Sequence, residues 1–296
     1  MFKRYLPLLF VLFVVLATVV AFLLFRDAGA PDAPAPVSRD GATPSDGVPE
    51  FKVESEEEFQ RALEALGTST EEIEAWARSH GFPPATYTSA PGTPLGQNYR
   101  AMREPELREL AEGGDPWAMQ FLAAHLSPEK PLEAVDWYRK AVVNGSAYAA
   151  IQLSSLYREV ARRVEIDQDN REAFIEIARR EEPLADASLA WLLIAEHEAG
   201  VPPGSIAATL TSFKAPDDSI TRACERAATL LAGIQAEREA KGVSVPVRKP
   251  PLAIELPAEE TLGYCPPEIF PRADFAGCET VRLVGDIGAI TGHRCR

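Results

Sequence analysis

The sequence is poor in the residues and motifs on which most catalytic and metal sites depend. It contains only four histidines and four cysteines. The Cys-x-x-Cys pair is absent, and so are the Gly-x-Ser-x-Gly nucleophile turn, the Walker phosphate loop and the Gly-x-Gly-x-x-Gly dinucleotide loop. His197-Glu198 begins like a zinc-protease helix, but Val201 stands where the second histidine belongs. The sequence therefore predicts no cofactor and no metal, and it identifies no catalytic residue.

Basic residues are also fewer than acidic residues. Lys and Arg number 30 against 44 Asp and Glu, which gives a formal net charge of −14 at pH 7. Nucleic acid and anionic lipid are both bound through basic side chains gathered in stripes or patches. The composition therefore predicts no nucleic-acid partner and argues against peripheral binding to an anionic membrane surface. The acidic excess is typical of a soluble surface whose carboxylates repel one another.

Charge is absent altogether between Tyr5 and Phe25, where Leu, Val, Phe and Ala predominate. A helix of about 20 residues crosses the roughly 30 Å of a bilayer's hydrocarbon core. Residues 1–26 are therefore predicted to form a transmembrane anchor. Two basic residues precede the apolar run, whereas Arg26 is followed directly by Asp27. The positive-inside rule then predicts a single-pass membrane protein with a cytoplasmic N-terminus and an exported bulk, facing the periplasm from a bacterial inner membrane.

A cleaved signal peptide is the alternative interpretation of this segment. Ala28-Gly29-Ala30 has the small-x-small form of a cleavage site. The apolar stretch is longer than the about 7–15 residues typical of a signal peptide, which favours the uncleaved anchor. Both interpretations export the rest of the chain.

The exported part divides by composition into four regions. Residues 27–50 are rich in Pro and Ala and predict a disordered linker, and residues 51–98 predict a short helical hairpin followed by a loop. Residues 99–242 show one helical signal after another, with no stretch that alternates apolar and polar residues. Residues 243–296 are rich in Pro and Cys and predict an extended, irregular tail. The predicted fold class is all-α, with an α-solenoid between the hairpin and the tail.

The helical region contains an internal repeat with an offset of 31 residues. Residues 114–126 align with residues 145–157, which places Trp117 over Tyr148 and Leu122 over Leu153. A period in the low thirties with two helices per unit is typical of an α-solenoid, because each unit buries its apolar face only against its neighbours.

The best-preserved unit resembles the Sel1-like repeat, a relative of the tetratricopeptide repeat. The segment from Leu132 to Gly145 contains the family's Glu-Ala, Trp-Tyr, Lys-Ala and Gly elements in order, and a helix with small residues, Leu and Tyr follows. The residues that carry the resemblance are Ala134, Trp137, Tyr138, Ala141, Gly145, Leu153 and Tyr157. The first four recur at i, i+3, i+4 and i+7, on one helical face. The family's Gly-rich loop is absent, and residues 127–131 replace it.

Three of the four cysteines, Cys265, Cys278 and Cys295, lie in the tail, and the fourth, Cys224, lies on an apolar helical stripe. An exported compartment is oxidising, so this clustering predicts disulfides. We favour Cys265–Cys278, because that pair closes a short loop. Cys224 is then either a buried free thiol or the partner of Cys295.

The family resemblance implies a function in protein–protein interaction. A membrane-tethered scaffold would bind a protein or peptide on the solenoid surface, and Gln120 and Gln152 are candidate polar residues on that surface. A cell-envelope enzyme with a site in the Cys-rich tail, near His293, is the alternative. A third hypothesis is a subunit of a larger membrane complex in which the anchor itself makes helix contacts.

Overall fold

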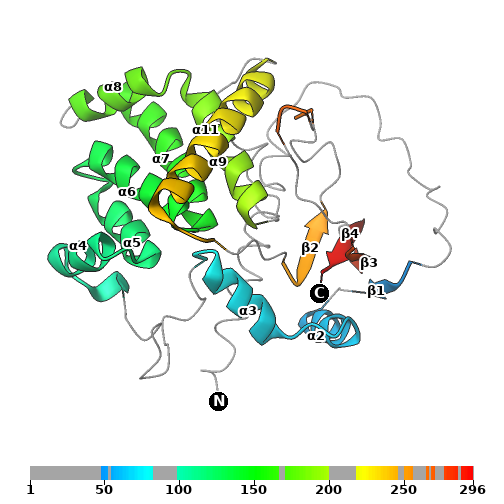
Figure 1. Ribbon diagram of the computed structural model, residues 1–296. Helices are drawn as coiled ribbons and strands as arrows, with labels where there is room; N and C mark the ends of the chain where they lie inside the picture. Colours follow the sequence, from blue (N-terminus) through cyan, green and yellow to red (C-terminus); the bar gives the residue numbers. More distant parts are fainter. Residues whose placement is uncertain are drawn as a thin grey trace.

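The computed structural model describes residues 48–52, 55–82, 99–166, 171–199, 218–245, 250–255, 265–266, 268–270, 277–285 and 288–295. These residues form a helical body with a small sheet beside it (Figure 1). The helices are α2 (Glu56–Ala65), α3 (Thr70–Ser79), the 3-10 turn η3 (Tyr99–Ala101), α4 (Glu104–Glu112), α5 (Pro116–Leu126), α6 (Pro131–Val143), α7 (Ala147–Ile166), α8 (Arg171–Arg180), α9 (Leu184–Ala199) and α11 (Ser219–Lys241). The strands are β1 (Glu50–Lys52), β2 (Leu252–Glu255), β3 (Glu279–Gly285) and β4 (Gly288–Arg294). The prediction that the chain is mostly helical is confirmed.

Local sequence explains where the helices of the body begin. Pro116 and Pro131 occupy the first turns of α5 and α6, where a missing N–H costs nothing. The Asp115 side chain caps α5 by accepting hydrogen bonds from the backbone N–H groups of Trp117 and Ala118. Consecutive helices of the body pack against one another from α4 to α8, α9 packs against α7, and α11 packs against α9 and α6.

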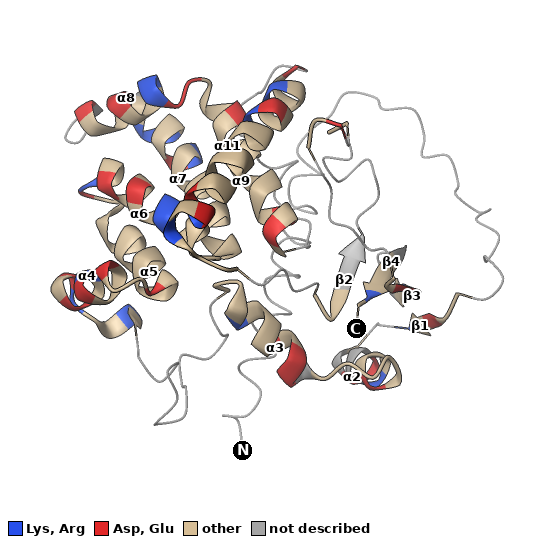
Figure 2. Ribbon diagram, viewed as in Figure 1, with Lys and Arg blue, Asp and Glu red and all other residues tan. Residues whose placement is uncertain are grey.

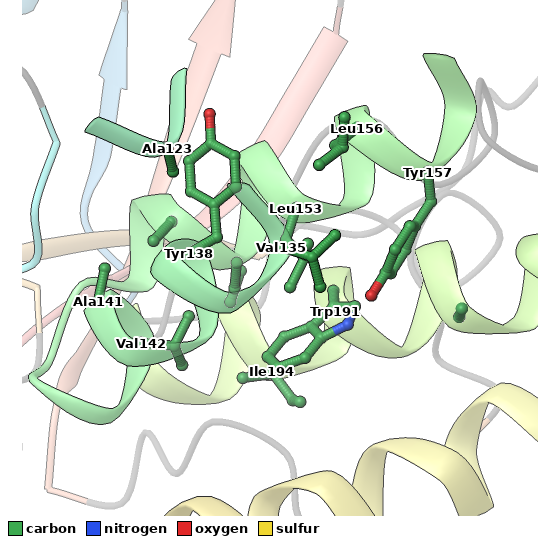
Figure 3. Packing of buried hydrophobic residues seen from close by; sticks show 14 of the residues in the cluster. Ala123, Val135, Tyr138, Ala141, Val142, Leu153, Leu156, Tyr157, Trp191 and Ile194 are labelled. Atoms are coloured by element: carbon green, nitrogen blue, oxygen red, sulfur yellow. The ribbon is translucent and has the colours of Figure 1, made fainter. Parts of the chain in front are cut away.

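The apolar stripe of α6 faces the centre of this body. Ala134, Trp137, Tyr138 and Ala141 are all buried, and Leu153 and Tyr157 of α7 are 0% exposed. Figure 3 shows the Tyr157 hydroxyl directed toward the indole of Trp191, on α9. Because burial disfavours the charged phenolate, it raises the pKa of Tyr157 to about 12, and the side chain remains neutral.

Small residues allow α7 and α9 to approach closely. Ala149 and Ala150 on α7 and Ala187 on α9 are 0% exposed. Between the two helices the hydroxyl oxygens of Ser154 and Ser188 lie 2.8 Å apart, and Ser188 also donates to the backbone carbonyl of Ser154. Each buried hydroxyl is therefore hydrogen-bonded, which avoids the cost of an unpaired polar group.

Two equivalent turns join the helices at the ends of the repeats. Gly114 and Gly145, separated by the repeat offset, both have a φ of +95°. Glycine suits this conformation because it has no Cβ to clash with the backbone. The surroundings of the two residues differ. A Cβ at Gly145 would lie 3.0 Å from Val245, whereas a Cβ at Gly114 would have no neighbour within 4 Å.

This difference gives a matched pair of substitutions. Gly114→Ala should destabilise the chain by about 1–2 kcal/mol, the cost of a left-handed alanine. Gly145→Ala should cost a further 1–3 kcal/mol or so, because the added methyl also crowds Val245. Urea unfolding of the full chain measures both values. Equal losses would show that residue 245 does not pack against the α6–α7 turn.

The C-terminal region is not the irregular tail that the sequence predicts. It supplies three strands of a four-stranded sheet with the order β1-β3-β4-β2. The edge strand β1 comes from the N-terminal side of the helical body and pairs in parallel with β3, with Phe51 opposite Leu283. Val281 and Leu283 are buried, as are Ala62 and Leu63 on α2, which packs beside β1. The chain therefore has a second, smaller core that joins its two ends.

Disulfides are present, but the predicted pairings are wrong. Cys224 on α11 is bonded to Cys265, and Cys278 is bonded to Cys295, so none of the four is free. Neither a Cys265–Cys278 bridge nor a Cys224–Cys295 bridge forms. The reason is the antiparallel register of β3 and β4, which places Glu279 opposite Arg294 and so brings the cysteine before β3 next to the cysteine after β4.

The predicted anchor at residues 1–26 and most of the linker at residues 27–50 lie outside the described residues. Within the part of the chain that the structure describes, no helix combines the length and apolarity needed to cross a membrane. Helices α2 and α3 lie where the sequence predicts a helical hairpin. Ser55 caps α2, and Ser69 and Glu72 form a capping box at the start of α3.

Candidate functional site

The described residues contain no group of three or more His, Cys, Asp or Glu side chains that could hold a metal ion. The tail region was the alternative location for an active site. His293 lies there on β4, opposite Thr280 of β3 and Ala253 of β2. Both nearby cysteines, Cys278 and Cys295, are bonded to each other, and a bonded sulfur is neither a nucleophile nor a thiolate ligand. The remaining candidate is the surface of the helical body.

One side of α7 carries polar residues that are not buried in the core. The opposite side packs into the body through Ala149, Leu153 and Tyr157, each 0% exposed. The other side presents Tyr148, Gln152, Ser155 and Arg158, which are all half-buried. These four residues form the α7 face. They recur at intervals of three or four residues, so they lie along one line of the helix.

Arg158 is the exceptional charge on this face. Its Nη2 donates to the hydroxyl of Ser155 over 3.0 Å, but its Nε is buried and has no hydrogen-bond partner among the described residues. Burial lowers the pKa of Arg158, and no carboxylate in the described part of the chain offsets that cost. A half-buried guanidinium without a carboxylate partner favours a ligand that supplies a carboxylate.

The neighbouring arginines on α7 are different. Arg162 and Arg163 both bind the carboxylate of Glu159, which lies one turn earlier on the helix. The hydrogen bond from Arg162 lowers the pKa of Glu159 to about 2, so the carboxylate stays charged. This charge offsets those of Arg162 and Arg163, and Arg158 is left without such a partner.

The two glutamines that the sequence offers as surface candidates differ in burial and in hydrogen bonding. Gln120 on α5 is buried, and its amide is used within the chain. Its Nε2 donates to the backbone carbonyl of Gly81, and its Oε1 accepts from the Ser146 hydroxyl. Gln152 is half-buried, and no hydrogen bond joins its side chain to another described residue. Only Gln152 is therefore available to a partner.

A cluster of aromatic side chains joins η3 to α5. Tyr99, Trp117 and Phe121 stack with ring centroids 5.7–6.3 Å apart, and the Tyr99 hydroxyl donates to Asp115 over 2.7 Å. Burial, with the added effect of Asp115, raises the pKa of Tyr99. Trp117 and Phe121 are half-buried, so α5 offers apolar ring faces in addition to the polar groups of α7.

Ion pairs join the helices of the body. Glu181 binds both Arg139 of α6 and Arg226 of α11, and Asp186 of α9 binds Arg222 of α11. Figure 2 shows basic and acidic residues interspersed over the helices rather than gathered by sign. These pairs link α11 to α9 and, through Glu181, to α6.

A further ion pair, Arg238–Glu198, is buried and joins three helices. Arg238 on α11 donates to both carboxylate oxygens of Glu198 on α9, over 3.0 and 2.8 Å. It also donates to the backbone carbonyls of Val142 and Val143, at the end of α6. The guanidinium thus bonds carbonyls of the last turn of α6, where the helix has no further N–H groups of its own to offer, and it shares the Val142 carbonyl with the N–H of Gly145.

Sequence reasoning did not single out Arg158, although a signal exists. On a helix, an arginine finds acidic partners three or four residues away. Arg162 and Arg163 have Glu159 at that spacing, whereas Arg158 has only Ser, Ala and Arg at its four such positions. No comparable signal predicts that the Gln120 amide hydrogen-bonds within the chain, because its partner Gly81 is distant in sequence.

The helical body thus carries, on α7, a half-buried guanidinium without a carboxylate partner and a side-chain amide without a hydrogen bond among the described residues, and, on α5, half-buried aromatic rings. Comparison of the chain with protein-family models, with curated proteins and with solved structures finds no match.

Proposed function

We propose that this chain is a membrane-anchored interaction scaffold, built from Sel1-like helix pairs, whose α7 face binds a segment of a protein partner on the exported side. The observation that carries the proposal is Arg158, whose half-buried guanidinium has no carboxylate partner among the described residues. The side chain of its neighbour Gln152 has no hydrogen bond to another described residue. Polar groups in this state favour binding, because a ligand that pairs them removes an existing cost.

The chemistry of the face suggests the kind of segment. An arginine offers a planar fork of donors that matches a carboxylate, and a charge-assisted hydrogen bond of this type contributes about 1.5–3 kcal/mol. A glutamine amide offers both a donor and an acceptor, which suits the backbone of an extended segment. The half-buried rings of Tyr148, Trp117 and Phe121 suit apolar side chains. The expected ligand is a peptide segment with a carboxylate near apolar residues.

The exported location is supported by chemistry rather than by the anchor alone. All four cysteines form disulfides, and such bonds persist in oxidising compartments. The charge asymmetry around the predicted anchor favours the same side of the membrane. In this proposal residues 27–47 connect the anchor to β1 and let the helical body reach its partner.

Site-specific photo-cross-linking tests the proposal. A photoreactive residue in place of Gln152 should yield discrete adducts with one protein in intact membranes, because the partner segment lies on the α7 face. The matched control is the same residue at Thr229, which is exposed on α11, away from this face. Adducts of equal yield and identity from both positions would contradict a binding site on α7.

A further inference from the structure

The segment that follows α3 contacts the helical body next to the α7 face. Three consecutive residues make the contact, His80, Gly81 and Phe82, which we call the docking segment. His80 and Gly81 are buried, although they directly follow a helix that carries several exposed residues. Figure 1 shows α3 reaching the body while α2 lies by the sheet.

Backbone hydrogen bonds fix the docking segment on the body. The carbonyl of Gly81 accepts from Gln120 Nε2 over 2.9 Å, and the carbonyl of His80 accepts from the backbone N–H of Tyr148 over 3.2 Å. The Ser146 hydroxyl completes the network by donating to Gln120 Oε1 over 2.7 Å. Gln120, Ser146 and Tyr148 together form the α5–α7 junction. The junction thus recognises two successive backbone carbonyls, as it would those of a bound peptide.

Steric fit makes glycine necessary at the centre of the segment. Gly81 has a φ of +80°, and a Cβ there would lie 2.2 Å from the Ser146 hydroxyl oxygen. The following residue, Phe82, packs against the ring of Tyr148 in a tilted arrangement, with centroids 5.6 Å apart. The junction therefore selects a helix that ends at a glycine in the left-handed conformation and continues with an aromatic residue.

The junction and the α7 face share Tyr148. The docking segment therefore covers the N-terminal end of the surface that we propose for the partner, while Gln152 and Arg158 remain half-buried beyond it. Residues 83–98 link the segment to Tyr99 of the body. A ligand tethered by a short connection competes at an effective concentration on the order of millimolar.

We infer that the α5–α7 junction is a peptide-docking site that the chain's own docking segment occupies in cis, and that a partner helix ending in glycine and an aromatic residue binds there by displacing it. This inference rests on the proposed function, because it names the chemistry of one end of the same surface. A partner must therefore bind the junction more tightly than the tethered docking segment does before it can contact Tyr148.

Two glycines, one after the end of α2 and one after the end of α3, provide the variants. Gly81→Ala inserts a methyl group against Ser146 and should release the docking segment. Gly67→Ala is the control, because Gly67 ends α2 with a φ of +64° but has nothing within 4 Å of its Cβ position. Both variants share the backbone strain, and only the first loses the contact. Hydrogen exchange of the Tyr148 amide, which donates to the His80 carbonyl, should rise at least tenfold in the full-length Gly81→Ala chain and stay within twofold of wild type in Gly67→Ala.

The probe is a labelled synthetic peptide with the sequence of residues 69–82. It should bind the full-length Gly81→Ala chain at least ten times more tightly than the wild-type or Gly67→Ala chain, because only the first leaves the junction open. Phe82→Ala provides a second way to release the segment if Gly81→Ala does not fold, and it should give the same ranking.

Three results would overturn the inference. They are unchanged exchange in both releasing variants, equal peptide affinity for released and wild-type chains, and no peptide binding to a chain whose exchange shows release. The cross-linking yield at Gln152 tests the proposed function independently of the peptide-binding measurement. Adducts at Gln152 without peptide binding would leave the scaffold standing and remove only the cis-occupied site.

Discussion

Replacing Arg238 by alanine is expected to lower the free energy of unfolding by about 3–5 kcal/mol. The side chain is 13% exposed and that of its partner Glu198 is 9% exposed, so the substitution leaves a carboxylate buried without its counter-charge. It also removes the hydrogen bonds from the guanidinium to the carbonyls of Val142 and Val143. Urea unfolding of the full chain in mild detergent, followed by tryptophan fluorescence, measures the loss.

Lys241→Ala is the matched control for Arg238→Ala. It lies on the same helix and also pairs with a glutamate, Glu237, but its side chain is 50% exposed. An exposed pair at this spacing contributes only about 0.3–0.5 kcal/mol. Similar losses for the two variants would mean that burial and the α6 carbonyls add nothing, and that Arg238 does not join the three helices as described.

Removing the Cys224–Cys265 bridge is expected to destabilise the chain by about 4 kcal/mol. The two cysteines are 41 residues apart, and a bond across a loop of that length restricts the unfolded chain strongly. Cys224 is 0% exposed among apolar residues of α11, so alanine at both positions disturbs little else. The double variant Cys224→Ala/Cys265→Ala, measured by the same urea unfolding, gives the value.

The second bridge supplies the comparison. Cys278 and Cys295 are 17 residues apart, so the same argument gives about 3 kcal/mol for their double replacement. Mass spectrometry of unreduced peptides should find both pairs. A Cys265–Cys278 peptide in its place would contradict the register of β3 and β4 on which the observed pairing depends.

The helical body could be predicted because its signals are local. Pro116, Asp115 and Pro131 mark helix starts within a few residues, and Ala134, Trp137, Tyr138 and Ala141 repeat at helical spacing and are buried. Each of these features depends on neighbours that lie within one or two turns of the same helix. The turn glycine Gly145 follows from the same alignment, and its φ of +95° agrees with that role.

The sheet could not be predicted because its pairings are distant. β1 has only three residues and pairs in parallel with β3, from the far end of the chain. β4 reads Gly-Ala-Ile-Thr-Gly-His-Arg, which lacks a clear alternation of apolar and polar residues. The disulfide pairing follows from this sheet, so the preference for a short loop around Cys265 and Cys278 fails with it. Strand pairs of this kind depend on tertiary packing more than on propensity.

The candidate site shows the same division. The lack of an acidic partner for Arg158 can be read from the residues three and four positions away on α7. The loss of Gln120 as a surface residue cannot, because it depends on Gly81 and Ser146 meeting across the fold. Sequence therefore indicates which charges lack a local partner, whereas the structure shows which surfaces the chain itself covers.

The affinity of the partner segment for the full chain tests the central claim most directly. With the segment captured at Gln152 as ligand, Arg158→Ala should weaken binding at least tenfold, because it removes a charge-assisted hydrogen bond worth about 1.5–3 kcal/mol. Arg162→Ala should change affinity less than twofold, because the Arg162 guanidinium is exposed and paired with Glu159. Equal effects of the two substitutions, or none from Arg158→Ala, would contradict a binding site built on the α7 face.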